Sequence, residues 1–519
     1  MGYTIGNDLK GGGKTAMFTA GMLLGTLLIC SADQTKSTTK APLGINLAGI
    51  ADWSTELVFV DQFRAARRWI SQAKGKPWGQ GGPLDVDADG HVKSLRPEQY
   101  AETILWTDFG KTFPEGTFIC LYDGEGELAF SGDARISKSS PGRLELEVKA
   151  NNGMASLRIM RTNPKNPVRN IRVLHPGHEK TYKEKPFHPS LLKRWQGCKV
   201  VRFMDWQATN NSKQVEWVDR PRLDTHSQAI KGVCVELLCE FCNTTGMDPW
   251  FCLPHRASDD YITRFCQLVK ERLDPKRTIY LEYSNECWNS QFEQARYCAE
   301  QGQKLGLSKN AFEAQLRFYS QRSVELFALA EKVLGKDRLV RVLATQSANP
   351  WTGTTVMDWK EAYKQADAIA IAPYFGHRFG SPKMADQVAK MSVEALLEEL
   401  AKDIEANKAK VQTYAQEAKK RKLRLLAYEG GQHLAGYGGA ENNEALTKLF
   451  HAANRHPRMK QLYLRDYANW NEAGGDLFAV FSSVGRYSKW GSWGQLESFT
   501  QKTSPKYEAL REYLRLAQP

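Results

Sequence analysis

The spacing of hydrophobic and polar positions changes along the chain. Residues 43–53 (LGINLAGIADW) form a short β-rich run, and the apolar residues of 56–70 (ELVFVDQFRAARRWI) recur at helical spacing. From Gly81 to Leu174, short alternating runs such as RLELEVKA are separated by Gly, Asp, Asn and Pro. This alternation predicts an inserted antiparallel β-sandwich.

From Lys199 onward, apolar strand-like runs alternate with helical patterns. The predicted strands are 199–206, 248–255, 278–286, 339–347, 367–375, 423–431 and 477–483, and the clearest helices are 258–273, 312–334 and 392–421. Parallel strands need such crossover helices. Together with 43–53 there are eight strands, so we predict an α/β fold, a (β/α)8 TIM barrel interrupted by the sandwich.

The expected domain plan follows from these patterns and from the first residues. Lys10 and Lys14 precede an apolar run that ends near Ala32, which is typical of a secretory signal peptide. A lipid attached to Cys30 is the less favoured alternative, because bulky Ile29 precedes it. We therefore expect a secreted or periplasmic protein without stable membrane insertion once the signal is removed. The predicted segments are 1–32 signal peptide, 33–42 linker, 43–80 first barrel unit, 81–174 inserted sandwich and 175–519 remaining barrel units.

Composition and charge restrict the partners. The chain has 519 residues, 42% hydrophobic and 25% charged, which is typical of a soluble globular protein of more than one domain. Its net charge of +13 is spread along the chain, and the densest basic run, 418–426, is predicted to be a helix end leading into a strand. No nucleic-acid-binding module is visible. A polysaccharide or oligosaccharide partner that could be anionic stays open.

The cysteines do not indicate disulfides or a metal site. Without the signal segment there are nine, an odd number, and most fall inside predicted helices and strands. Cys239 and Cys242 form a CxxC on a predicted helix with no second pair, so we interpret them as small buried side chains. No metal or other cofactor is expected.

Two predicted strands end in glutamate. Strand four ends at Glu286, with Glu282 and Asn285 just before that end. Strand seven ends at Glu429. Barrel enzymes carry catalytic groups at these carboxyl ends. Strand alternation puts Glu282 one layer below Glu286, where Arg202 of strand two is a plausible buried partner.

Two carboxyls across a barrel mouth suit glycoside hydrolysis. The retaining form of that reaction needs an acid and a nucleophile ~5 Å apart. Strands four and seven face each other across an eight-stranded barrel, which leaves room for a sugar between their side chains. Tyr374 at strand six and Asn285 can assist the nucleophile and a sugar hydroxyl.

The residues ExxNE at 282–286, Glu429 in AYEGG and Tyr374 in APYF resemble the large clan of retaining barrel glycoside hydrolases. The resemblance implies Glu286 as acid/base, Glu429 as nucleophile and Asn285 as ligand for the sugar 2-hydroxyl. Departures are Ser284 before the asparagine and Cys287 after the glutamate. The expected substrate-binding residues are Asn285, Arg202, His255, Tyr374, Trp53, Trp206, Trp490 and Trp493.

Other interpretations remain beside this one. A secreted carbohydrate-binding or cell-surface protein without catalysis is the main alternative, and a metal-dependent barrel hydrolase is disfavoured because no HxH ends the first strand. A second WNE at 470–472 is predicted to end a helix, and DVDADG at 85–90 is predicted to be a turn rather than a calcium loop.

Overall fold

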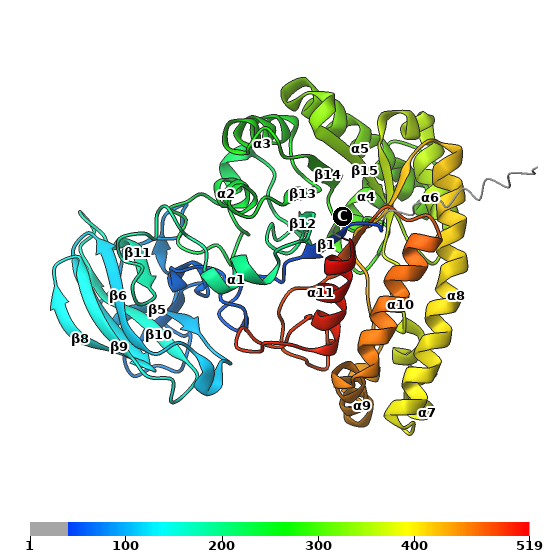
Figure 1. The fold of residues 1–519 in the computed structure, drawn as a ribbon. Coiled ribbons are helices and arrows are strands. Elements are labelled where there is room, and N and C mark those ends of the chain that lie inside the picture. Colours follow the sequence, from blue (N-terminus) through cyan, green and yellow to red (C-terminus); the bar gives the residue numbers. More distant parts are fainter. Residues whose placement is uncertain (1–39, 518–519) are drawn as a thin grey trace, which may run out of the picture. The chain divides into compact units, whose positions relative to one another are not determined.

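The computed structural model describes residues 40–517, so the predicted signal peptide, Cys30 and most of the linker lie outside the described residues. Eight parallel strands close into a barrel in chain order (Figure 1). They are β1 (Leu43–Asn46), β12 (Val200–Arg202), β13 (Asp248–Leu253), β14 (Ile279–Tyr283), β15 (Leu339–Ala344), β16 (Ala368–Ile371), β17 (Arg424–Ala427) and β18 (Leu477–Phe481). The predicted (β/α)8 barrel is confirmed.

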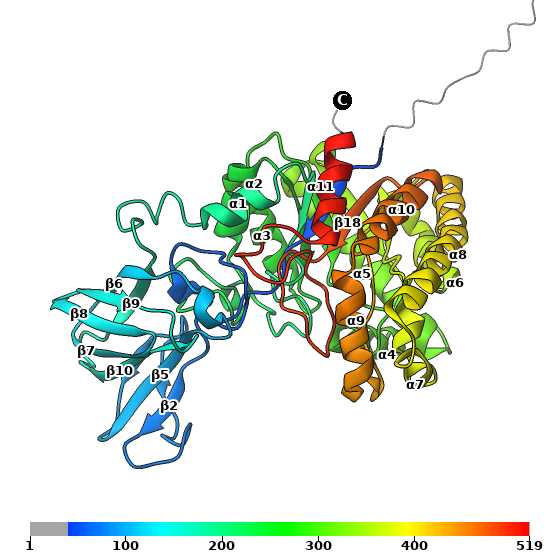
Figure 2. The same cartoon turned by 60° about the horizontal axis from the view of Figure 1, so that its bottom comes forward.

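Helices surround the barrel strands in both views (Figures 1 and 2). They are α1 (Pro189–Arg194), α2 (Val235–Thr245), α3 (Asp259–Arg272), α4 (Glu293–Lys304), α5 (Ala311–Leu334), α6 (Pro350–Asp358), α7 (Ala385–Val388), α8 (Val393–Lys420), α9 (Glu444–Arg455), α10 (Arg458–Glu472) and α11 (Pro505–Ala517). Helices α3, α5 and α8 coincide with the three clearest sequence predictions. The second WNE is the end of α10, as expected.

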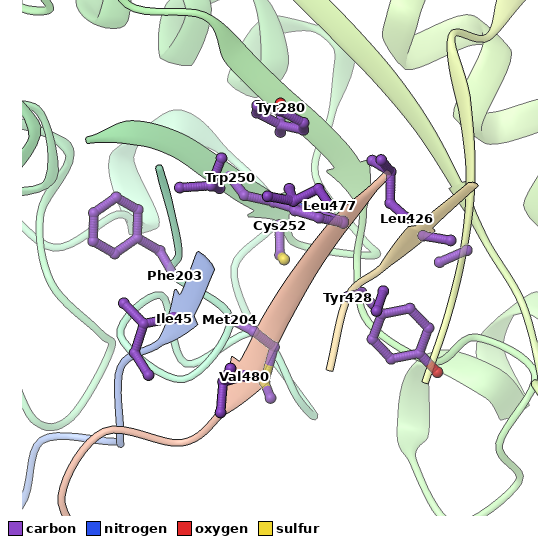
Figure 3. Close-up of a cluster of buried hydrophobic side chains, with 14 of the residues drawn as sticks. Ile45, Phe203, Met204, Trp250, Cys252, Tyr280, Leu426, Tyr428, Leu477 and Val480 are labelled. Carbon is purple, nitrogen blue, oxygen red and sulfur yellow. The ribbon is translucent and has the colours of Figure 1, made fainter. Parts of the chain in front are cut away.

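The barrel strands are buried on both faces, because helices cover the outside and side chains fill the inside. All six residues of β13 (DPWFCL) are buried, and so are all six of β15 (LVRVLA). Figure 3 shows part of this core, to which Ile45, Trp250 and Leu477 come from three different strands. Continuous apolar runs of this kind made the strands recognisable in the sequence.

The inserted sandwich is also confirmed. Its strands are β2 (Ile70–Ala73), β3 (Asp85–Val86), β4 (Val92–Ser94), β5 (Gln99–Trp106), β6 (Gly116–Asp123), β7 (Gly126–Gly132), β8 (Ala134–Ser140), β9 (Arg143–Val148), β10 (Ala155–Thr162) and β11 (Arg169–Leu174). One four-stranded sheet has the order β2-β5-β10-β7, the other has the order β11-β6-β9-β8, and β3 and β4 form a two-stranded sheet. In β9, Leu144, Leu146 and Val148 point inward, as the alternation predicts. DVDADG covers β3 and most of the turn that leads to β4.

The helix predicted over 56–70 is wrong. Only a 3₁₀ turn, Gln62–Ala65, forms there, and β2 (Ile70–Ala73) pairs with β5. The segment supplies two cores: Val58 and Phe59 pack in the barrel, whereas Leu57 and Phe63 pack in the sandwich. Apolar residues that serve two cores imitate helical spacing. The insertion therefore begins by Ile70, inside the 43–80 segment assigned to the barrel.

Loops of the sandwich touch loops at the barrel mouth. The Thr107 backbone N–H donates to the Asp52 carbonyl at 2.7 Å, and the rings of Phe109 and Phe499 lie 5.9 Å apart. Arg486, after β18, forms an ion pair with Asp108 at 2.7 Å. The insertion thus contacts the segments that follow β1 and β18.

The described part of the chain offers no sign of a membrane span or a metal cluster. Across residues 40–517, every helix is too short or too polar to cross a bilayer. Over the same range, no three His, Cys, Asp or Glu side chains gather so that they could hold a metal ion. The nine cysteines in this range are free and buried, including Cys239 and Cys242 on α2.

Candidate active site

Arg202 lies at the centre of the barrel mouth and is fully buried. Its guanidinium donates to the Glu282 carboxylate at 2.9 Å, to Oε1 of Glu429 at 2.9 Å and to Oδ1 of Asn285 at 2.9 Å. One cation thus joins groups from the ends of β12, β14 and β17. A planar guanidinium suits this role, because it presents five donors in a fixed geometry.

Glu282 lies beneath the mouth as the scaffold partner that the sequence suggests. It is fully buried and also accepts a hydrogen bond from Nε1 of Trp250 at 2.8 Å. Burial raises its pKa, while Arg202 acts in the opposite direction. A buried carboxylate needs such a partner to remain charged.

Glu429 follows β17 and reaches the mouth, where 6% of it is exposed. Its Oε2 accepts a hydrogen bond from the Tyr374 hydroxyl at 3.0 Å, opposite the Arg202 contact on Oε1. Two glycines then turn the chain away: Gly431 has φ +121°, and a Cβ on Gly430 would lie 2.2 Å from Phe478. The EGG sequence therefore fixes how this carboxyl is presented.

Glu286 is half-buried and is held by neutral donors. The Tyr428 hydroxyl donates to its Oε1 at 3.0 Å, and Nδ2 of Asn289 donates to its Oε2 at 2.9 Å. Its backbone is left-handed (φ +44°), and so is that of Ser284 (φ +58°). L-residues rarely adopt this conformation, and such strain concentrates at functional sites.

The two mouth carboxyls differ in their electrostatic surroundings. Burial raises the pKa of both Glu286 and Glu429, and Arg202, which bonds directly to Glu429, opposes the rise there. The charge of Glu286 raises the pKa of Glu429 further, so the pair favours holding one proton. Of these two carboxyls, Glu429 is the one that hydrogen-bonds to the Arg202 guanidinium in the described structure. The arrangement therefore favours the charge on Glu429 and the proton on Glu286.

Asn285 lies between these groups. Its Oδ1 accepts from Arg202, and its Nδ2 donates to Oδ1 of Asn210 at 3.0 Å. The same Asn210 oxygen accepts from Gln294. The side-chain amide of Asn285 is thus oriented by bonds on both sides, close to the carboxyl pair.

A pocket of about 490 Å³ lies on the Tyr374 side of Glu429, although neither mouth carboxyl lines it. It is lined by Trp53, Trp490, Trp493, Asp205, Phe481 and Arg486, among others. The Trp493 ring lies 5.8 Å from that of Tyr374, the residue that bonds to Glu429. Trp53 and Trp490 are 60% and 64% exposed, so each can present an indole face to a sugar ring.

Two expected binding residues are placed elsewhere. Trp206 is 1% exposed, donates to the Ala48 carbonyl and packs against Phe187, so the prediction that it binds substrate is wrong. The residue closes the barrel core behind the strand end. His255 lines a different pocket, where its ring lies 5.3 Å from that of Tyr297.

Four residues at the site escaped the sequence reasoning: Tyr428, Asn289, Asn210 and Asp205. Tyr428 was missed because alternation puts it on the face opposite to Glu429. Strand β17 ends at Ala427, so both side chains turn to the mouth. Burial raises the pKa of the Tyr428 and Tyr374 phenols, which keeps both as donors.

Comparisons with known proteins give only distant structural likeness. No protein-family model matches the chain, and no curated protein matches it. One similar solved structure is an endo-1,4-β-D-mannanase from Thermotoga petrophila (13% identity, 63% of this chain and 94% of that chain, TM-score 0.35). Another is an endoxylanase from a sugarcane soil metagenome, at 9% identity over 62% of this chain and 89% of that chain, with a TM-score of 0.34.

A third is β-glucuronidase 2 of Bacteroides uniformis, at 10% identity over 76% of this chain and 46% of that chain, with a TM-score of 0.33. The match to an endo-β-1,4-mannanase of Cellulomonas fimi spans 44% of that chain's length (TM-score 0.28). At these identities and TM-scores the likeness defines neither the substrate nor the reaction of this protein.

Proposed function

We propose that this protein is a retaining glycoside hydrolase that cleaves glycosidic bonds in a polysaccharide or oligosaccharide, with Glu286 as acid/base and Glu429 as nucleophile. The observation that carries the proposal is the asymmetry of the two carboxyls. Glu429 accepts a charge-assisted bond from Arg202, whereas Glu286 accepts from the neutral donors Tyr428 and Asn289. One carboxylate and one carboxylic acid are what double displacement needs.

In the first step Glu286 gives its proton to the glycosidic oxygen as Glu429 attacks the anomeric carbon. The bond to the leaving sugar breaks, and a glycosyl ester forms on Glu429. Loss of its proton leaves Glu286 as a carboxylate. It then takes a proton from water, the hydroxide oxygen bonds to the anomeric carbon, and the ester electrons return to Glu429. Both carboxyls regain their starting states, and the sugar keeps its configuration.

Tyr374 and Asn285 support these steps. The Tyr374 hydroxyl bonds to Oε2 of Glu429 and so orients the nucleophile. Asn285, fixed by Arg202 and Asn210, can bond to the sugar hydroxyl beside the anomeric carbon. Preorganised contacts of this type stabilise the transition state without rearrangement during the reaction.

The alternative is a carbohydrate-binding protein without catalysis. The exposed Trp53 and Trp490 favour sugar binding under either proposal. The intact, asymmetric carboxyl pair favours hydrolysis, because binding alone does not require two desolvated acids whose pKa values are raised. Turnover therefore separates the two functions.

The test is release of reducing sugar from a panel of polysaccharides by wild type, Glu286→Gln and Glu429→Gln. Glu472→Gln is the matched control: it alters the second WNE, at the exposed end of α10. We expect activity in wild type and control and its loss in both site variants, with unchanged circular dichroism. Binding without turnover in wild type would support the adhesion function, and activity in either folded site variant would refute the assignment.

Azide distinguishes the two roles. In Glu429→Ala, azide can enter from the vacated side and give a glycosyl azide of inverted configuration. In Glu286→Ala, azide can attack the glycosyl ester and give a retained product. Both reactions need a substrate with a good leaving group, and proton NMR of the anomeric position reads the outcome. The reverse pattern would exchange the roles.

A further inference from the structure

Asp205 places a carboxyl in the tryptophan-lined pocket. The residue follows β12, three positions after Arg202, and lines the pocket with Trp53 and Trp490. Across residues 40–517, no group hydrogen-bonds to its side-chain oxygens in the structure, and no cation pairs with it within 4.0 Å. It is half-buried. Desolvation raises its pKa to about 6 against the opposing effect of Arg202, and its charge raises the pKa of Glu429.

The basic residue of the same pocket is already paired. Arg486 forms its ion pair with Asp108 of the sandwich at 2.7 Å. Lys489, beside Trp490, donates to Asn442 at 3.0 Å and lies 4.7 Å from the indole centroid. Within the described lining, Asp205 is therefore the charged group that a ligand meets unpaired.

We propose that Asp205 is a specificity-determining residue that accepts hydrogen bonds from hydroxyls of an uncharged sugar stacked on the pocket tryptophans, and that it disfavours uronic or sulfated sugars there. This rests on the proposed glycoside hydrolase function and defines its substrate as a neutral glycan at this position. The net charge of +13 left an anionic substrate open, and this inference argues against an anionic sugar in the tryptophan-lined pocket.

The physical basis is twofold. An ionised, partly desolvated carboxylate forms strong bonds with hydroxyl donors, and two adjacent hydroxyls can bond to its two oxygens. A second carboxylate or a sulfate at the same place would meet repulsion in a site of low dielectric, with no free cation to offset it. Arg202 does act on Asp205, but its guanidinium is bonded to Glu282 and Glu429 and so is already neutralised by them.

The experiment measures binding in the Glu286→Gln background, so that the glycan is not consumed. Affinity gels contain either neutral polymers (glucomannan, xylan, mixed-linkage β-glucan) or anionic ones (polygalacturonate, alginate). The proteins compared are Glu286→Gln alone and combined with Asp205→Ala, Asp205→Asn or Asp205→Glu. Asp224→Asn, an exposed aspartate outside the pocket, is the control.

We expect Asp205→Ala to weaken binding of the preferred neutral polymer about 10- to 100-fold, the loss typical of a hydrogen bond to a charged group. Asp205→Asn should lower the preference for neutral over anionic polymers about tenfold, and Asp205→Glu should restore part of it. A purely structural role would weaken binding of every polymer alike and leave this preference unchanged.

The outcomes also separate this inference from the proposed hydrolase function. Asp205-dependent binding of a neutral glycan that wild type does not hydrolyse would keep the inference and refute hydrolysis. Hydrolysis that is lost in Glu286→Gln but unaffected by Asp205→Ala would keep the hydrolase function and refute the inference. Equal binding of polygalacturonate and neutral polymers, or no glycan binding at all, would overturn the inference.

Discussion

Nη1 of Arg202 lies 2.9 Å from Oε1 of Glu429, while the other side of the same guanidinium bonds to Glu282. The scaffold carboxylate and the proposed nucleophile therefore share one buried cation. This coupling links the stability of the fold to the charge state of the site.

Glu282→Gln should destabilise the fold and alter the nucleophile. Removing one partner from a buried ion pair costs about 3–5 kcal/mol in the free energy of unfolding. Without the charge of Glu282, the positive charge of Arg202 stabilises ionised Glu429 more strongly, so the pKa of Glu429 falls. The acid limb of the pH–rate profile then moves to lower pH. Urea denaturation measures the loss of stability, and the pH dependence of kcat/KM measures the shift of the acid limb. The control Glu472→Gln removes an exposed ion pair and should change the free energy of unfolding by less than about 1 kcal/mol. An equal loss of stability in the two variants would contradict the prediction.

Tyr374→Phe and Tyr428→Phe should act on opposite limbs of the pH profile. Each removes a hydrogen bond that stabilises a charged carboxylate, so each raises the pKa of its partner. Glu429 must be ionised to react, so Tyr374→Phe moves the acid limb to higher pH. Glu286 must be protonated, so Tyr428→Phe moves the alkaline limb to higher pH. We expect kcat to fall about 10- to 100-fold in Tyr374→Phe. Shifts of the same limb in both variants would argue against the assigned roles.

His226 should weaken the protein in acid. The ring is buried against Phe63 and Trp69, neither nitrogen has a partner within the described residues, and burial lowers its pKa from 6.5 to about 3. The unfolded chain takes up this proton first, so stability is lost as pH falls from 6.5 toward 3. At pH 5 the loss is about 2 kcal/mol. His226→Phe should remove this loss of stability. The difference between the urea midpoints at pH 7.5 and pH 5 should then be smaller in the variant than in wild type. An unchanged difference would contradict the assignment.

Export is proposed from residues 1–32, which lie outside the described structure. Mass spectrometry of the chain recovered from periplasm or medium should find that it starts after Ala32. Leu24→Arg places a charge in the apolar run and should retain the chain in the cytoplasm, whereas Thr38→Arg, beyond the run, should not. Recovery of the full-length chain only inside the cell, with wild-type residues 1–32, would refute the proposal.

Much of the barrel could be predicted because its signals are local. Each strand is a short apolar run with helical periodicity beside it, and the carboxyl ends of such strands meet at one mouth. Glu286, Glu429, Tyr374 and the Arg202–Glu282 pair follow from strand ends and alternation. The segment 56–70 failed because its apolar residues divide between two cores, which no spacing rule reveals.

The sequence by itself determined the architecture and the chemical types at the strand ends. Only the tertiary structure decided which of them meet: Tyr428 bonds to Glu286 across 142 positions of chain, Trp206 packs inward, and Asp205 faces a pocket whose arginine is held by the sandwich. The physical reason is that secondary structure follows from neighbours a few residues apart. A site is set by side chains that the closed barrel brings together from distant positions.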